Sequence, residues 1–177
     1  MTVDMCQEED KGAQLAELLD DVLKEKTDRA VGFADTKWKV DDIACNLRTG
    51  GWPAIGLHGK KVKKERDWAL SMFSSGAESV LVTTDMVVQD FALPHVRLVV
   101  NYGCPDFSKT YAHRLKHTQR SEGSSVVHTF LVPSQHLQAK TLIEILEDAK
   151  QSAKRDSDRW SRGDWDDGGP HKQLFVE

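Results

Sequence analysis

The segment VLVTTDMVVQDFALPHVRLVVN, residues 80–101, contains two short apolar runs separated by a mixed stretch. The first run covers residues 80–83 and the second covers residues 98–101, and neither alternates regularly between apolar and polar side chains. Runs of this kind are typical of strands that are buried on both faces of a parallel sheet. Three further runs have the same character, at residues 30–34, 54–57 and 126–132.

The segments between these runs have helical patterns. In residues 37–48, apolar side chains recur at positions 40, 43, 44 and 47, which is the spacing of one helix face, and two glycines follow as a stop signal. Residues 65–73 and 138–149 carry similar stripes, which we expect to face the core. Strands alternating with helices predict an α/β fold with a mostly parallel sheet and helices on both faces.

Composition divides the chain into three parts. Residues 1–28 carry nine acids and three bases and form an acidic lead-in, with leucines and valines at helical spacing between positions 15 and 23. Residues 29–151 hold the predicted α/β domain. Residues 152–177 are rich in Asp, Ser, Gly and Arg and have few apolar side chains, so they are predicted to form a disordered tail.

Several classes of protein are disfavoured by the sequence. The 177 residues include no apolar run long enough to span a bilayer, and the acidic N-terminus is unlike a targeting peptide, so we expect an intracellular protein with no membrane partner. The three cysteines form no CxxC pair, so neither a disulfide framework nor a zinc site is indicated. The sequence has no P-loop and no acid pair after a strand, so we expect no ATP or magnesium site in this chain alone.

One short segment is strongly basic although the formal net charge is -4. Residues 58–66, HGKKVKKER, hold Lys60, Lys61, Lys63, Lys64 and Arg66 against a single acid. Such a run can be a phosphate-binding edge. It can also be the solvated start of a helix, and composition alone leaves both interpretations open.

Three strings in order resemble the second RecA-like domain of DEAD-box RNA helicases: LHGKKVKKERDWALSMFSSG, VLVTTDMVVQDFALPHVRLVVNY and YAHRLKHTQRSEG. In that family they typically read LHGD..Q.ERD, ATD.A.RGLD.P and HRIGRTGR. The resemblance covers residues 29 to about 151 and implies a RecA-like sheet. The lead-in and the stretch GWPA, residues 51–54, look closest to the branch of abundant nuclear RNA helicases, which favours the nucleus as the location.

The resemblance implies roles on the RNA side. Thr84 matches a threonine that contacts an RNA phosphate, and Asp85 follows it unchanged. Arg66 matches the arginine of a pair that touches RNA, and the four lysines of residues 60–64 add attraction for phosphates. His113 and Arg114 match the start of the third motif. A packed histidine is the alternative for His113, and a surface pair at a helix start is the alternative for Arg114 and Arg120.

The nucleotide side departs from the family pattern. Ala92 stands where the family has an aspartate that binds the ribose of ATP, and Gln89 and Asp90 replace an arginine and a glycine that link the two domains. Of the two arginine fingers that stabilise charge on the γ-phosphate, only Arg120 remains, as the one catalytic candidate, because His117 occupies the other position.

These departures suggest a pseudohelicase, a helicase C-terminal domain degenerate in its ATP-contacting motifs. We expect it to bind RNA, or a helicase N-terminal domain or other protein partner, without hydrolysing ATP on its own. ATP and Mg²⁺ would enter only if an ATP-binding domain is paired with it. Two alternatives stay open: one half of a functional ATP-dependent DEAD-box helicase, or a pure protein-interaction module.

Overall fold

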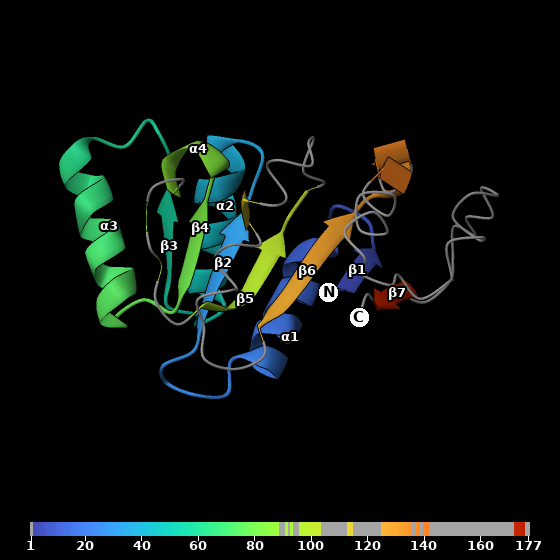
Figure 1. Cartoon of the computed structure of the whole chain (residues 1–177), viewed down its shortest axis with the longest axis horizontal. Coiled ribbons are helices and arrows are strands. Elements are labelled where there is room, and N and C mark those ends of the chain that lie inside the picture. Colours follow the sequence, from blue (N-terminus) through green and yellow to red (C-terminus); the bar gives the residue numbers. More distant parts are fainter. Residues whose placement is uncertain are drawn as a thin grey trace.

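The computed structural model describes residues 2–88, 91, 93, 96–103, 113–114, 125–135, 137–138, 140–141 and 172–175. In this part of the chain a seven-stranded sheet has the order β3-β4-β2-β5-β6-β1-β7 (Figure 1). Six strands pair in parallel, and β7 is antiparallel to β1 at one edge. The strands are β1 Thr2–Met5, β2 Arg29–Phe33, β3 Ala54–Leu57, β4 Val80–Thr83, β5 Val96–Asn101, β6 Val126–Leu131 and β7 Lys172–Phe175.

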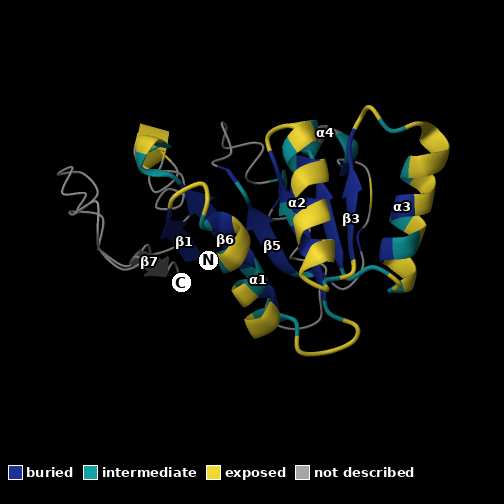
Figure 2. Ribbon diagram, turned by 180° about the vertical axis from the view of Figure 1, so that it is seen from behind, coloured by how far each residue is buried: buried dark blue, intermediate teal, exposed yellow. Residues whose placement is uncertain are grey.

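Helices cover both faces of this sheet, as the sequence predicts. They are α1 Lys11–Val22, α2 Lys37–Thr49, α3 Lys63–Ser75 and the short α4 Asp85–Val88, with a 3-10 turn at Pro133–Gln135. Seen from behind, α1 and α2 lie in front of the strands (Figure 2). Leu15, Leu19 and Ile43 from these helices pack in one core cluster, whereas Ala69 and Phe73 of α3 pack in another.

The strands separate the two clusters because successive side chains of a strand point to opposite faces. On β2, Ala30 belongs to the cluster under α1 and α2, whereas Val31 and Phe33 belong to the cluster under α3. Both faces are therefore buried, which is why apolar residues follow one another in these strands instead of alternating with polar ones. The prediction of a mostly parallel α/β sheet with helices on both faces is confirmed.

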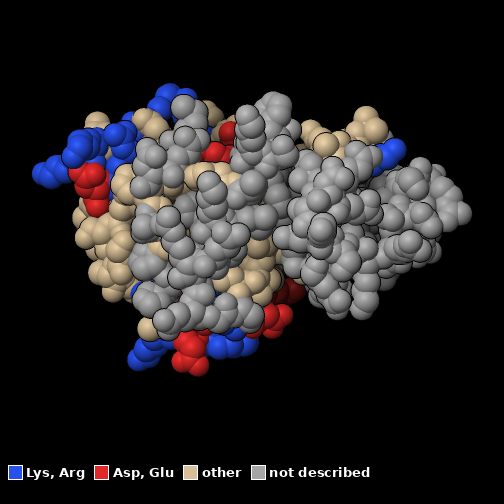
Figure 3. Space-filling view, in the orientation of Figure 1, with Lys and Arg blue, Asp and Glu red and all other residues tan. Residues whose placement is uncertain are grey.

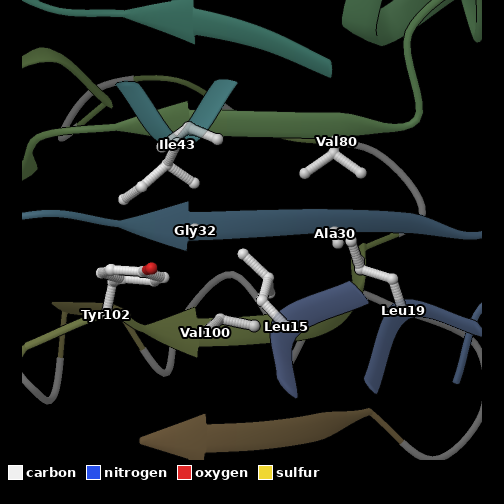
Figure 4. Close-up of a pocket in the computed structure, with 9 residues that line it drawn as sticks. Leu15, Leu19, Ala30, Gly32, Ile43, Val80, Val100 and Tyr102 are labelled. Carbon is white, nitrogen blue, oxygen red and sulfur yellow. The ribbon is translucent and has the colours of Figure 1, made fainter. Parts of the chain in front are cut away.

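A small void lies under α1 and α2, beside Gly32 of β2 (Figure 4). Its volume is about 10 Å³, and Leu15, Leu19, Ile43 and Tyr102 contribute to its lining. A space of this size is at the lower limit for one water molecule, and an apolar lining gives a water few partners. Burial raises the pKa of the Tyr102 phenol to about 12, and the charge of Glu8 adds to this shift.

The predicted element bounds agree closely with the structure in the middle of the chain. Residues 54–57 and 80–83 form strands as predicted, and the lead-in contains the predicted amphipathic helix, α1. The structure adds a strand that the sequence did not indicate, β1, so the lead-in contributes to the sheet. The prediction of a disordered tail is wrong for residues 172–175, which form β7. Most of the predicted helix 138–149 lies outside the described residues.

Candidate nucleic-acid interface

The candidate site lies at the carboxyl edge of three neighbouring strands. Leu57 of β3 pairs with Thr83 of β4, and Thr83 pairs with Phe33 of β2, so these strands end at one level. The residues that follow, His58, Thr84 and Ala34, therefore emerge side by side. Helices α2, α3 and α4 all begin near this edge (Figure 1). Ligands of open parallel α/β sheets bind at such carboxyl edges.

The basic run of residues 58–66 forms the turn after β3 and the start of α3. Lys and Arg side chains gather at this end of the molecule (Figure 3). Two of the lysines have carboxylate partners, since Lys61 lies 3.5 Å from Asp41 and Lys63 lies 3.0 Å from Asp67. Lys60 and Lys64 are exposed, and no carboxylate of the described residues pairs with either. Among the four lysines of the run, these two therefore keep a charge without a carboxylate partner.

Arg66 has a structural partner of its own. Its guanidinium donates a hydrogen bond to the Lys61 carbonyl at 3.0 Å, which fixes the turn before α3. Nearby, His58 Nε2 lies 2.9 Å from Asp41 Oδ2. Burial alone would raise the pKa of Asp41, but the hydrogen bond with His58 and the charge of Lys61 hold that pKa below its usual value. The turn that carries Lys60 is thus held in place by Asp41 of α2 and Arg66 of α3.

Thr84 offers a hydroxyl at this edge. Its carbonyl accepts hydrogen bonds from Thr83 Oγ1 at 3.2 Å and from the Val87 amide at 3.2 Å. Its side chain is half-buried, and the hydroxyl has no partner within the described part of the chain. Thr84 directly follows β4, the strand that lies between β3 and β2 in the sheet. A phosphate at the edge could therefore meet this hydroxyl together with lysine charge.

Arg114 is buried, with 2% of its surface exposed, so the interpretation as a surface pair is wrong for this residue. Its guanidinium donates to both carboxylate oxygens of Asp85, at 2.7 and 2.6 Å, and to Asn101 Oδ1 at 2.8 Å. Asn101 in turn donates to Thr129 at 2.9 Å. The guanidinium also lies 4.9 Å from the ring centre of Phe33. This network fixes the backbone next to Thr84.

The comparisons with known proteins identify the family. Residues 10–122 match the model of the helicase conserved C-terminal domain. The chain belongs to this family. As a helicase C-terminal domain it is 37% identical over 150 residues to the probable ATP-dependent RNA helicase DDX17 of Mus musculus, with 85% of this chain and 23% of that protein covered. The domain therefore spans less than a quarter of that relative, and it is a C-terminal RecA-like domain of the DEAD-box type.

Solved structures agree with this assignment. The domain resembles the E. coli DEAD-box protein SrmB bound to the regulator RraA, with a TM-score of 0.69, 28% identity, and coverage of 77% of this chain and 78% of that one. It also resembles a variant of S. cerevisiae Dbp5 bound to RNA and ADP BeF3, with a TM-score of 0.69, 27% identity, and coverage of 82% and 37%.

The residues on the nucleotide side are not placed by the structure. Gln89, Asp90, Ala92, His117 and Arg120 lie outside the described residues of the helicase C-terminal domain. His113 is described and half-buried, next to Arg114. In the described part of the chain, no three His, Cys, Asp or Glu side chains are grouped as a metal site would require. No helix found there has the length and apolar character needed to cross a membrane.

Sequence reasoning missed two residues of this edge, Lys37 and Trp38, at the start of α2. Trp38 is 72% exposed, and the ammonium groups of Lys37 and Lys60 lie 6.0 and 5.8 Å from its ring centre. Close contact with the Lys60 ammonium lowers the pKa of Lys37. The helical pattern contained a signal, because a tryptophan at position 38 falls off the apolar stripe of residues 40, 43, 44 and 47 and so faces away from the core.

Proposed function

We propose that this helicase C-terminal domain binds single-stranded RNA through phosphates at the carboxyl edge of β2, β3 and β4, and does not hydrolyse ATP on its own. The observation that carries the proposal is the unpaired charge at this edge. Lys60 and Lys64 are exposed without carboxylate partners in the described part of the chain, on the same edge as the Thr84 hydroxyl.

Charge and geometry together support phosphate contacts. A lysine that is already paired with a carboxylate contributes less to phosphate binding, because the ion pair with the phosphate must replace the ion pair with the carboxylate. Lys61 and Lys63 are in this position, whereas Lys60 and Lys64 are not. Arg66 spends one N–H on the Lys61 carbonyl and retains others for a phosphate. Two similar proteins whose names mention RNA, DDX17 and Dbp5, support the same class of ligand.

The proposal is tested by titrating a labelled single-stranded RNA at two salt concentrations. Each phosphate contact on a single strand contributes about -0.7 to the slope of log K against log salt. The double variant Lys60→Gln, Lys64→Gln should therefore bind more weakly and lose about 1.4 of that slope. The matched control is Lys24→Gln with Lys26→Gln, which removes two exposed lysines from the turn before β2, at the opposite edge of the sheet.

The control should bind RNA as the unmodified domain does. If both double variants lose affinity and slope equally, the attraction is a property of overall charge and the edge is not the site. If the unmodified domain shows no salt-dependent RNA binding, the proposal fails and the alternative of a protein-interaction module is favoured; the similar protein SrmB is bound to the protein RraA.

The absence of ATP hydrolysis follows from substitutions in the sequence. The methyl group of Ala92 cannot accept a hydrogen bond from a ribose hydroxyl, and His117 is shorter than an arginine and largely neutral at pH 7. Arg120 then remains as the only arginine-finger candidate. ATP and Mg²⁺ would be bound by a separate ATP-binding domain, and this domain would close on them with weakened contacts.

A chimera tests the nucleotide side, with an active ATP-binding domain of a DEAD-box helicase fused ahead of residue 28. It should turn over ATP far more slowly than the parent enzyme. Ala92→Asp should mainly lower the ATP concentration needed, and His117→Arg should mainly raise the maximal rate. If the unmodified chimera is as fast as its parent, the domain is one half of a functional helicase.

The location of the protein is also a proposal. The resemblance to abundant nuclear RNA helicases favours the nucleus. A fluorescent fusion of the chain, imaged against a nuclear stain, should overlap with that stain, and a signal that is excluded from the nucleus would contradict the proposal.

A further inference from the structure

Trp38 is unusual among the aromatic residues at the carboxyl edge because most of its indole is in water. It is 72% exposed, on the first turn of α2, where no core contact explains a large apolar side chain. Exposed tryptophan is costly to keep in water, whereas a stacked base would cover its ring. Single tryptophans on surfaces are common, so the exposure alone does not assign a role.

Two lysine side chains lie close to the exposed ring of Trp38, and their charges indicate what kind of ligand it would bind. Lys37 and Lys60 come from different elements, α2 and the turn after β3, yet their ammonium groups lie 6.0 and 5.8 Å from the same ring centre. The Lys60 ammonium also lowers the pKa of Lys37. Two ammonium groups from different elements therefore meet at one indole, and 72% of the surface of this tryptophan is exposed.

Two adjacent ammonium groups repel one another and favour an anion between them. Nearby acids do not provide it, because Asp41 is occupied by His58 and Lys61, and Glu8 is occupied by Lys11 and Lys39. In the described part of the chain neither Lys37 nor Lys60 has a carboxylate partner. The pair is thus placed for a phosphate, next to an uncovered aromatic surface.

We propose that Trp38, Lys37 and Lys60 form a subsite for one nucleotide of single-stranded RNA, in which the base stacks on the indole and its phosphate lies between the two ammonium groups. This subsite rests on the proposed function, since it adds a base contact to the phosphate contacts of the same edge. Aromatic side chains combined with positive charge are the common means of holding single strands without regard to sequence, because every base has a flat face.

The subsite lies beside the other phosphate contacts. β4 lies between β3 and β2 in the sheet, so Thr84 leaves the sheet beside the strands that precede Lys60 and Trp38. A strand of RNA that follows this edge would pass from Lys64 and Lys60 to Trp38. Stacking on Trp38 can be told apart from phosphate binding by experiment. Stacking requires a base on the RNA strand, whereas phosphate binding requires only the charged backbone.

The test compares two end-labelled oligonucleotides of equal length, one of uridines and one abasic, so that the phosphates match and only the bases differ. The unmodified domain should bind the base-containing strand more tightly. Trp38→Ala should weaken that binding by about 5- to 150-fold, the range seen for a lost stacking contact. It should leave the affinity for the abasic strand and the salt slope unchanged.

Matched variants separate stacking from other effects. Trp68→Ala removes another exposed tryptophan, 57% exposed on α3, and should change neither affinity. Trp38→Phe should retain part of the preference for bases, because a smaller ring still stacks. Lys37→Gln with Lys60→Gln should weaken both strands alike. A thermal melt of each variant by circular dichroism confirms that the fold is retained.

The outcomes distinguish this subsite from the proposed function. If the unmodified domain binds both strands equally, or if Trp38→Ala retains the preference for bases, the subsite is wrong while phosphate binding stands. If Trp68→Ala abolishes the preference, the stacking position lies on α3 and the assignment to Trp38 is overturned. If neither strand binds, the proposed function fails and the subsite fails with it.

Discussion

Gly32 provides a test of the packing that supports the binding edge. It lies on β2 beside the void under α1 and α2, and a methyl group added to it would meet only the Val82 methyl carbons, at 4.0 Å. That distance is ordinary van der Waals contact. Gly32→Ala should therefore place its methyl in the void of about 10 Å³ without displacing a neighbour.

The expected gain has two parts. Burying one methyl group contributes about 0.8 kcal/mol. Replacing glycine at a position that alanine can adopt adds about 0.4–1 kcal/mol, because the unfolded chain loses freedom. The free energy of unfolding should thus rise by about 1–2 kcal/mol. For a domain of this size the melting temperature should increase by about 3–6 °C.

Gly56 on β3 is the matched control because it is also a glycine inside a buried strand. A methyl group there would lie 3.2 Å from Val40 Cγ1 and 3.4 Å from Asp41 Oδ1. The effect on the unfolded chain is the same as for Gly32, but crowding costs about 1–3 kcal/mol. Gly56→Ala should therefore be neutral or destabilising.

The assay is thermal unfolding followed by circular dichroism, together with urea denaturation for the free energy of unfolding. RNA affinity should be unchanged in Gly32→Ala, because the void lies under the helices and not at the carboxyl edge. The reasoning is refuted if Gly32→Ala lowers the melting temperature. It is also refuted if the two glycine variants shift it equally, since the void would then contribute nothing.

Three further predictions concern charged and reactive side chains. Asp85→Asn should lower the free energy of unfolding by about 3 kcal/mol in urea denaturation, because it leaves Arg114 as a buried cation, and a loss below about 1 kcal/mol would contradict this. Iodoacetamide at pH 8 should modify exposed Cys45 at least about tenfold faster than buried Cys6, whose pKa burial raises to about 11, as peptide mass spectrometry would show. The lowered pKa of Asp41 means that its ionised form stabilises the fold above its usual pKa of 3.8 and that this contribution is lost as pH falls through the folded value. Asp41→Asn should therefore reduce stability at pH 7, and the difference from the unmodified domain should shrink in urea denaturation below pH 3.8.

The central part of the fold was predictable because it rests on local signals. The runs at residues 54–57 and 80–83 are largely apolar because both faces of the sheet are covered. A strand buried on both faces can therefore be recognised from four consecutive residues. The stripe of α2 likewise needs only residues within one helix. Such signals do not depend on which elements become neighbours.

The strands β1 and β7 could not be found in this way. β1 is four residues long and contains a buried charge, Asp4, whose carboxylate lies 3.0 Å from His128 Nε2 on β6. A charged residue disfavours a buried strand unless its partner is known, and this partner is far away in the sequence. β7 pairs only with β1, so it was missed for the same reason.

The sequence predicted which basic residues form the candidate site, but not which of them have carboxylate partners. The sequence gathers Lys60, Lys61, Lys63 and Lys64 in one run, but it does not show that Asp41 of α2 pairs with Lys61. It also gives no sign that Lys60 lies beside a tryptophan from another element. Pairings between elements decide which charges remain available, and they appear only once the strands have been ordered.

The RNA side and the nucleotide side of the domain differ in which charges remain available. Arg114 matches a helicase motif, but its guanidinium is bound to Asp85 and Asn101, so its charge is already balanced within the fold. It therefore supports the edge that carries Thr84 and adds no free charge for a nucleotide. If Ala92 and His117 have removed contacts on the nucleotide side, the RNA side does not depend on them, because its lysines are held by α2, α3 and the turn after β3. Binding of RNA can thus persist in a domain that has lost its part in ATP hydrolysis.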